Sequence, residues 1–259
     1  MIARQGQRAA PVCVLTFHRI VAEPRSMFEL SWAAFAAILD LIGTGAVRVS
    51  ASLAPEIFGS CDAVLTFDDA TIDHSVVGEV LAQRELRGLF FVPTAKLGEP
   101  GRLSAEDLVR LRSLGHRIGS HGHSHTPLRR TSDLVEELHE SKACLEAIVG
   151  EAVTDFAPPG GIYSPRLLAE LRRDGYSAAR SLRYGLYRSE RDRWRVPSVT
   201  VNELAARRRW VQVALTRRML PPAARGVWIA KGLAPARVRA SVGAMLLGRS
   251  ARERLGTRQ

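Results

Sequence analysis

Two adjacent carboxylates, Asp68 and Asp69, directly follow the apolar and β-branched segment 63–67. Such a segment predicts a buried strand, so both acids stand at the end of a strand. In parallel α/β sheets and barrels, catalytic groups lie at the carboxyl ends of the strands. Two neighbouring acids can divide the chemistry there, because one can bind a metal ion while the other moves protons.

Three of the seven histidines, His121, His123 and His125, stand close together in the segment 119–125, which also contains two glycines. The glycines argue against a helix and indicate a strand that leads into a loop. His121, His125 and one carboxylate would form a metal site with open coordination positions. The alternative is a solvated polar loop without a metal. With a metal, these residues suit amide or ester hydrolysis, since the other carboxylate can accept a proton from the attacking water.

A third segment, 156–161, carries two prolines followed by two glycines. The prolines predict a rigid turn, and the glycines allow the backbone to approach a ligand. A backbone N–H in this turn could hold an oxyanion. The alternative is an ordinary turn between a strand and a helix.

Strand-like and helix-like patterns alternate along the chain and must position these segments. The expected strands span 12–17, 64–67, 88–92, 116–120, 154–157, 178–181 and 196–201, and the expected helices span 31–42, 76–84, 104–114, 133–149 and 164–174. Ser31 and Ser104 are the predicted N-caps of the first and third helices. Repeated β–α alternation implies a parallel sheet, and about seven strands favour a barrel.

The chain has 259 residues and a net charge of +11, which its C-terminal part carries. Residues 205–259 hold 13 Lys and Arg against one acid, Glu253, and the other 204 residues hold 24 basic and 25 acidic groups. We therefore expect a core domain, 10–201, and a basic, mainly helical extension, 202–259. The extension suits an anionic membrane surface or, alternatively, a helix that closes the barrel with a solvated basic face. No recognised motif for nucleic-acid binding accompanies the charge.

The three cysteines, Cys13, Cys61 and Cys144, are scattered and form no CxxC pair. This pattern predicts reduced, mostly buried thiols in a reducing compartment. The apolar run at 12–17 is too short for the core of a signal peptide, and no segment reaches the roughly 18 apolar residues of a membrane span. We expect a cytoplasmic protein. The alternative location is the inner face of the plasma membrane, with peripheral attachment.

The three segments occur in the order and at the spacing of the motifs of the polysaccharide deacetylase family, the NodB homology domain of carbohydrate esterase family 4. The similarity covers residues 10–201. Thr66-Phe-Asp-Asp69 resembles the first motif and implies Asp68 as the catalytic base and Asp69 as a metal ligand. The segment 121–125 resembles the second motif and implies His121 and His125 as the other ligands of a divalent metal, preferably Zn²⁺.

The segment 157–161 resembles the third motif, whose backbone amide after the second proline helps to hold the oxyanion. The resemblance implies this role for the N–H of Gly160, with Pro159 and Gly161 beside the substrate. The family also implies a distorted (β/α) barrel and the metal-dependent removal of N-acetyl or O-acetyl groups from sugars.

Three positions depart from the family's pattern. Ala70 stands where the first motif has glycine, Gly122 where the second has serine or threonine, and Ala157 where the third has arginine. We therefore expect Asp68 to lack its usual arginine neighbour. Ser120 or Ser124 could supply the hydrogen bond lost at Gly122.

The family's C-terminal motif normally provides a histidine as general acid, yet no histidine follows His139. The candidates for proton delivery to the leaving amine are His18, His123, and Asp68 acting in both roles. His18 and His123 are also candidate substrate-binding residues. Of the other histidines, His74 is a candidate to line the cleft, whereas His116 and His139 are expected at the surface.

The main hypothesis is a metal-dependent hydrolase that removes N-acetyl or related acyl groups from a carbohydrate during the biosynthesis or modification of a cell-surface polysaccharide. Its substrate would be a sugar, in free or lipid-linked form. One alternative is a catalytically impaired, sugar-binding member of the same fold. The other is a deformylase that acts on a lipid-linked sugar.

Overall fold

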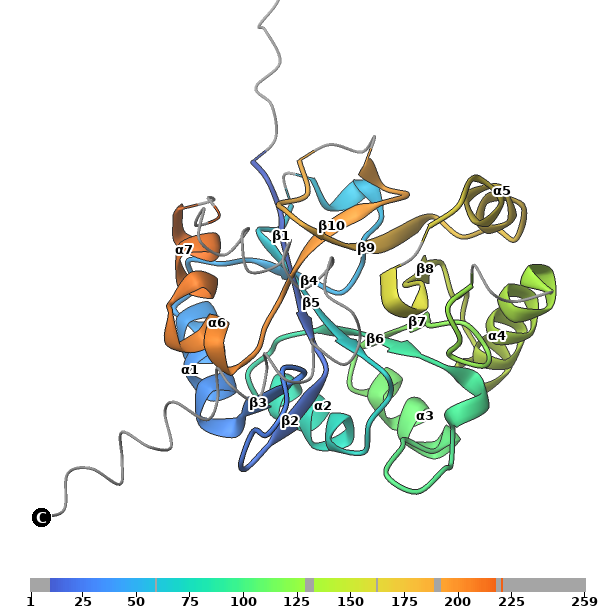
Figure 1. Ribbon diagram of the computed structural model, residues 1–259. Helices are drawn as coiled ribbons and strands as arrows, with labels where there is room; N and C mark the ends of the chain where they lie inside the picture. The colour runs from blue at the N-terminus through green and yellow to red at the C-terminus, as the bar shows by residue number, and fades with distance from the viewer. Residues whose placement is uncertain are drawn as a thin grey trace, which may run out of the picture.

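The computed structural model describes residues 10–58, 60–128, 133–161, 163–188, 192–217 and 220. Seven strands form a closed, parallel barrel: β1 (Cys13–Phe17), β5 (Ala63–Asp68), β6 (Gly88–Val92), β7 (Arg117–Ser120), β8 (Asp155–Phe156), β9 (Ala178–Tyr184) and β10 (Val196–Thr200). The ring runs β1-β10-β9-β8-β7-β6-β5, and it closes because β1 also pairs with β5. The predicted barrel of about seven parallel strands is confirmed (Figure 1).

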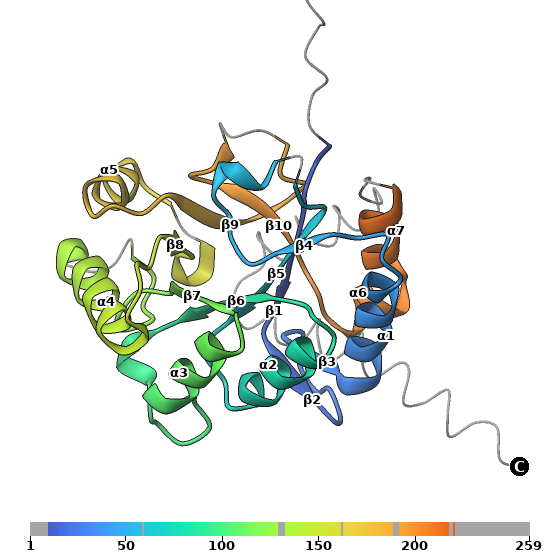
Figure 2. The same ribbon diagram turned by 180° about the vertical axis from the view of Figure 1, so that it is seen from behind.

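Helices surround the barrel in both views (Figures 1 and 2). They are α1 (Trp32–Gly43), α2 (Asp73–Gln83), α3 (Ala105–Ser113), α4 (Leu134–Val149), α5 (Pro165–Arg173), α6 (Glu203–Arg207) and α7 (Trp210–Arg217). The sequence patterns missed three short strands, β2 (Arg19–Val21), β3 (Glu29–Ser31) and β4 (Val49–Ser50), and three 3-10 turns, η1 (Pro55–Ile57), η2 (Thr94–Lys96) and η3 (Pro159–Gly161). β2 and β3 pair with each other outside the barrel, and β4 lies beside β5. Elements this short carry too little periodicity to predict.

Local signals set the helix ends. Ser31 accepts a hydrogen bond from the backbone of Ala34 at 3.2 Å, as its predicted N-cap role requires. Ser104 and Asp107 form a capping box at the start of α3, with bonds of 3.2 and 2.8 Å. Helices therefore begin where hydrogen-bonding side chains satisfy their free N–H groups.

Three helices, α2, α3 and α5, end in a Schellman motif with a left-handed residue. Gly115 (φ 86°) follows α3 and Gly175 (φ 77°) follows α5, but Glu85 (φ 57°) occupies the equivalent place after α2. Each end has the paired hydrogen bonds of a Schellman motif, such as Leu86 N to Leu81 O at 2.9 Å. Glycine adopts this conformation without steric penalty, so the glutamate leaves α2 with a strained end.

Side chains along each strand point alternately into the barrel and out toward the helices. On β5, Leu65 and Phe67 pack into the large cluster that includes the helices, whereas Val64 packs into a second cluster with residues such as Val14 and Phe91. Thr66 and Asp68 share the side of Val64, because side chains alternate with a period of two. Asp68 therefore points into the barrel at its carboxyl end.

The loop before β5 closes the opposite end of the barrel. Leu53 packs into the cluster of inward-facing residues, and its backbone N–H donates to Asp155 Oδ1 at 3.0 Å. Asp155, at the start of β8, is fully buried. Burial raises the pKa of its carboxyl to about 6, although the Leu53 N–H and the charge of Arg117 oppose the rise. This carboxyl lies at the amino end of β8, apart from the strand ends that carry the histidines.

The start of the basic extension packs against the barrel domain. Ala205, Val211, Ala214 and Leu215 are buried in the large hydrophobic cluster. The start of the expected helical extension is helical, with Asn202 as the N-cap of α6, but it breaks at Arg209 (φ 54°) into α6 and α7. The division into 10–201 and 202–259 stays a prediction, and residues 221–259 lie outside the described part of the chain.

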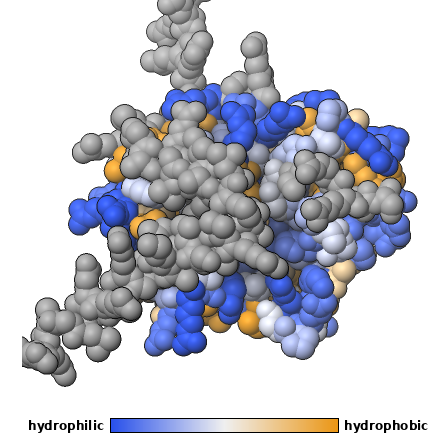
Figure 3. Space-filling view, viewed as in Figure 1, coloured by the Kyte–Doolittle hydropathy of each residue, from blue (hydrophilic) through white to orange (hydrophobic). Residues whose placement is uncertain are grey.

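The part of the described surface that is visible in Figure 3 is mainly hydrophilic. On the face in Figure 3, hydrophobic areas are small and separate. No helix in the described ranges has the length and hydrophobicity of a membrane span. Cys13 and Cys61 are buried, whereas Cys144 is exposed, and none of the three forms a disulfide.

Candidate active site

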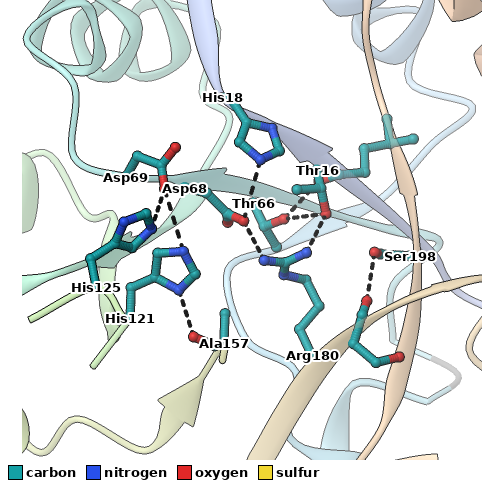
Figure 4. A network of polar contacts seen from close by, with 12 residues as sticks. Thr16, His18, Thr66, Asp68, Asp69, His121, His125, Ala157, Arg180 and Ser198 are labelled. Atoms are coloured by element: carbon teal, nitrogen blue, oxygen red, sulfur yellow. Dashed lines mark hydrogen bonds and ion pairs between the residues drawn. The ribbon is translucent and has the colours of Figure 1, made fainter. Parts of the chain in front are cut away.

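Asp69, His121 and His125 converge at the carboxyl ends of β5 and β7, the two strands that flank β6 (Figure 4). Asp69 directly follows β5, and His121 directly follows β7. Asp69 Oδ1 lies 3.4 Å from His121 Nε2 and 3.0 Å from His125 Nε2. One ligand atom from each residue falls within 4.8 Å of the others. This is the donor set that the sequence predicted, and its spacing suits one divalent cation.

The polar contacts of these residues fit a metal ion. His121 Nδ1 donates to the carbonyl of Ala157 at 2.5 Å, which leaves Nε2 facing Asp69 as a possible ligand atom. Burial would raise the pKa of Asp69, but contacts with His121 and His125 outweigh it and hold the pKa well below its usual range. Burial likewise disfavours protonated His121, but the Asp69 and Asp68 carboxylates raise its pKa overall. The site therefore attracts positive charge, which a metal ion can supply in place of a proton.

The backbone around the ligands is strained. Asp69 (φ 78°), Ala70 (φ 48°) and His125 (φ 63°) all adopt the left-handed conformation despite having a Cβ. Arg102 donates to the carbonyl of Asp69 at 2.6 Å, and the Leu103 N–H donates to that of Ala70 at 2.9 Å. These bonds hold the turn that sends Asp69 out of the strand direction while Asp68 stays in it. Such outliers cluster at functional sites.

Asp68 has an arginine partner, contrary to the expectation from Ala157. Arg180, an inward-facing residue of β9, forms a short bond from Nη2 to Asp68 Oδ2, and both side chains are almost fully buried. Its Nη1 donates to Thr16 Oγ1 at 3.2 Å, and Thr16 and Thr66 hydroxyls lie 3.1 Å apart. The arginine comes from another strand, so the motif position alone could not reveal it. An arginine inside a predicted barrel strand was the available signal, because such a residue must find a charge partner.

His18 stands on the other side of Asp68. Its Nε2 lies 3.9 Å from Asp68 Oδ2, and its ring is mostly buried. Burial lowers the pKa of His18, although the charges of Asp68 and Asp69 oppose that shift. His74, a cleft candidate from sequence, is instead fully buried and donates from Nε2 to the His18 carbonyl at 2.5 Å. It thereby supports the backbone of His18.

The histidine loop is held by a residue that the sequence analysis missed. The Glu137 carboxylate of α4 accepts hydrogen bonds from the backbone N–H groups of His123, at 2.9 Å, and Ser124, at 3.0 Å. Glu137 is itself buried on the core-facing side of α4, with Leu134 and Leu138. An acid within the apolar stripe of a predicted helix was the available signal.

The other predictions around this loop have mixed outcomes. Ser120, not Ser124, bonds to Gly122, since its Oγ accepts from the Gly122 N–H at 3.1 Å. The His123 ring contacts Thr94 Oγ1 at 2.9 Å. The surface prediction for His116 was wrong, because its ring is buried and bridges the backbones of β6 and α2, which periodicity in the sequence cannot show. His139 is exposed, as expected.

The third segment lies beside the histidines. The Ala157 carbonyl accepts from His121, and a Cβ at Gly122 would lie 3.8 Å from Pro159. Gly160 (φ 66°) is exposed, and the Gly161 N–H bonds back to the Pro158 carbonyl at 2.9 Å. The turn therefore presents exposed glycine backbone next to the metal-binding candidates, as an oxyanion role for Gly160 would require.

Known proteins share this fold. Residues 59–179 match the family model for polysaccharide deacetylase. Streptococcus pyogenes deacetylase PplD, in complex with acetate, is 18% identical, with a TM-score of 0.69 over 75% of this chain and 93% of that one. IcaB from Ammonifex degensii is 25% identical, with a TM-score of 0.69 over 79% and 98%. BC0361, a polysaccharide deacetylase from Bacillus cereus, is 21% identical, with a TM-score of 0.67 over 74% and 65%.

No curated protein matches the sequence. The family match covers the strands and loops that carry Asp68, Asp69 and the histidine segment, and the solved structures share the barrel around them. Over these residues the chain resembles the polysaccharide deacetylase family, the family of the NodB homology domain.

Proposed function

We propose that the protein is a metal-dependent hydrolase that removes N-acetyl or related acyl groups from a carbohydrate. The observation that carries this proposal is the divergence of two adjacent acids. Asp69 turns toward His121 and His125, whereas Asp68 turns toward Arg180 and His18. One acid is thus placed to hold a cation and its neighbour to move protons, which is the division that amide hydrolysis needs.

Asp69, His121 and His125 would hold the divalent metal, for which Zn²⁺ is the first candidate because two imidazoles and one carboxylate suit it. Such an ion supplies Lewis acidity, which polarises the acyl carbonyl and makes the attacking water more acidic. The exposed N–H of Gly160 would donate to the same acyl oxygen as it gains charge, and Pro159 and Gly161 would shape this side of the substrate site.

Asp68 would accept the proton of the attacking water. Arg180 occupies Asp68 Oδ2, and Oδ1 is buried without a hydrogen-bond partner among the described residues, so Oδ1 is the available acceptor. The guanidinium of Arg180 is the buried ion-pair partner of this carboxylate. We assign delivery of a proton to the leaving amine to a second group.

His18 is the group best placed for this step, because its Nε2 lies 3.9 Å from Asp68 Oδ2. Since burial lowers the pKa of His18, its ring is neutral at pH 7 and can accept a proton that Asp68 releases. It would then release that proton to the amine nitrogen as the C–N bond breaks. His123 is less suited, since its Nδ1 is engaged with Thr94.

Metal content and product release test the proposal. We expect purified protein to carry about one equivalent of divalent metal, and His121→Ala to lose it, whereas His139→Ala, a change at an exposed histidine, keeps it. We expect acetate release from N-acetylated sugars, and its loss in Asp68→Asn. Absence of metal from the wild type, or equal release by Asp68→Asn, would contradict the proposal. Sugar binding without release by either form would indicate the non-catalytic alternative, and formate release from a formylated sugar the deformylase.

We further propose peripheral membrane contact through the start of the basic extension, which would bring the site to a lipid-linked sugar. Arg208 and Arg209 are exposed between α6 and α7, whose buried residues anchor them to the barrel domain. Such residues attract anionic lipid. Sedimentation with phosphatidylglycerol vesicles should weaken when both arginines become serine, and equal sedimentation of both forms would argue for a solvated basic face.

A further inference from the structure

Phe28 is an exposed aromatic side chain beside the proton-transfer residues. It is the one aromatic among the large hydrophobic side chains that are exposed in the described chain, with 51% of its surface accessible. Its ring centroid lies 5.0 Å from that of His18, at an interplanar angle of 54°. His18 Nε2 in turn lies 3.9 Å from Asp68 Oδ2. Phe28 therefore contacts the ring of His18, the group that would protonate the leaving amine.

Core packing does not explain this placement. Phe28 lies outside both hydrophobic clusters, whereas Leu30, two residues later, is buried in the larger one. The exposed half of the Phe28 surface gains nothing from the hydrophobic effect until a ligand covers it. The other exposed hydrophobic side chains include Val109 and Val135, which lie on α3 and α4 outside the barrel.

The loop that carries Phe28 is held in place on both sides. The Phe28 carbonyl accepts from the Arg19 N–H at 3.0 Å, and its N–H donates to Ser26 Oγ at 3.3 Å. The Glu29 carboxylate accepts from the backbone of Arg25 at 2.6 Å and of Ser26 at 2.9 Å, and from the Arg19 side chain at 2.9 Å. A ring presented by a fixed loop loses little conformational entropy when a ligand covers it.

We propose that the face of Phe28 is a platform for the pyranose ring of the substrate. The C–H groups of a sugar face carry partial positive charge and pack against the negative face of an aromatic ring. A sugar over Phe28 can reach His18 with its amine nitrogen, while its acyl group points toward Asp69, His121 and His125. The direction of the acyl group rests on the proposed hydrolysis, whereas the stacking contact requires only that the protein binds a sugar.

Kinetics on a defined probe, tri-N-acetylchitotriose, test the platform. We expect Phe28→Ala to raise KM roughly three- to tenfold with kcat almost unchanged, and Phe28→Tyr to restore the wild-type KM. Val109→Ala, which removes a similarly exposed hydrophobic side chain far from the site, should leave both constants unchanged. A KM for Phe28→Ala equal to that of Val109→Ala would refute the platform.

A binding measurement separates this inference from the proposed function. In the Asp68→Asn background, Phe28→Trp should show a change in tryptophan fluorescence with the same trisaccharide that Val109→Trp does not show. Phe28→Ala should weaken binding of the trisaccharide in calorimetry. If no variant releases acetate but Phe28 still governs binding, hydrolysis is wrong and the platform stands. If neither KM nor binding depends on Phe28, the platform is wrong, whatever the turnover.

Discussion

Replacing Arg180 with methionine should cost several kcal/mol of stability. The guanidinium is about 98% buried and is the hydrogen-bonded cation of the buried Asp68 carboxylate. Methionine fills similar volume but leaves that carboxylate without a counter-ion, and breaking a buried pair in this way costs about 3–5 kcal/mol. Loss of the 3.2 Å bond to Thr16 adds about 1 kcal/mol. The free energy of unfolding of a folded domain is about 5–15 kcal/mol in total, so the unfolding midpoint should shift strongly.

A double-mutant cycle isolates the pair. Asp68→Asn alone leaves Arg180 buried and uncompensated, so it should also destabilise the fold. The double variant, Asp68→Asn with Arg180→Met, removes both charges. Its loss in free energy of unfolding should be smaller than the sum of the two single losses by about 2 kcal/mol or more. Arg180→Lys keeps the charge but cannot reach both Asp68 and Thr16, so it should fall between the wild type and Arg180→Met.

Urea unfolding followed by tryptophan fluorescence would measure each free energy, with a constant slope as the check on two-state behaviour. Single changes that add within about 0.5 kcal/mol would refute the ion pair. Activity gives a second criterion. If Arg180 holds Asp68 in place, Arg180→Lys should lower kcat more than it raises KM, and an unchanged kcat would show that Asp68 does not depend on Arg180 for its position.

Three further predictions concern other parts of the chain. Glu85→Gly should raise the free energy of unfolding by about 1 kcal/mol in thermal or urea unfolding, because it relieves a left-handed residue, whereas Glu85→Ala should not. Burial raises the pKa of Asp155 to about 6, so the native state keeps a proton that the unfolded chain releases from about pH 4. Stability should therefore fall as pH rises from about 4 to 6, and Asp155→Asn should remove that fall and gain about 2 kcal/mol at pH 7; a pH profile unchanged by Asp155→Asn would contradict this. Glu137→Ala should leave two loop N–H groups unpaired and weaken metal binding about 10- to 100-fold in a chelator competition, and an affinity equal to wild type would show that the loop is held by other contacts.

Local patterns accounted for most of the fold. Each of the seven barrel strands was expected within two or three residues of its position, because barrel strands here are short apolar runs bounded by turn residues. The helices with clear capping residues, such as Ser104, began where predicted. The short pair β2 and β3 was missed, and so was the break at Arg209, since neither leaves a periodic signal.

In the candidate site too, local sequence patterns indicated some residues and missed others. The order and spacing of Asp68, Asp69, His121 and His125 indicated a metal site and an adjacent base from sequence alone. The reason is that residues at the carboxyl ends of parallel strands meet at the same end of the barrel. The arginine partner of Asp68 could not be found in this way. Arg180 lies 112 residues further along the chain, and only closure of the barrel brings it to Asp68.

By itself, the sequence determined the βα order of the barrel, the family resemblance and the residue types at the ends of β5 and β7. Those features depend on local periodicity and on short motifs, which can be seen in a single sequence. The tertiary structure alone decided which way each acid of the adjacent pair points, and which groups surround it. The left-handed turn at Asp69 sends one carboxylate to the histidines, whereas strand alternation keeps Asp68 inside with Arg180. The reason is physical: contacts between distant residues form only when the strands assemble.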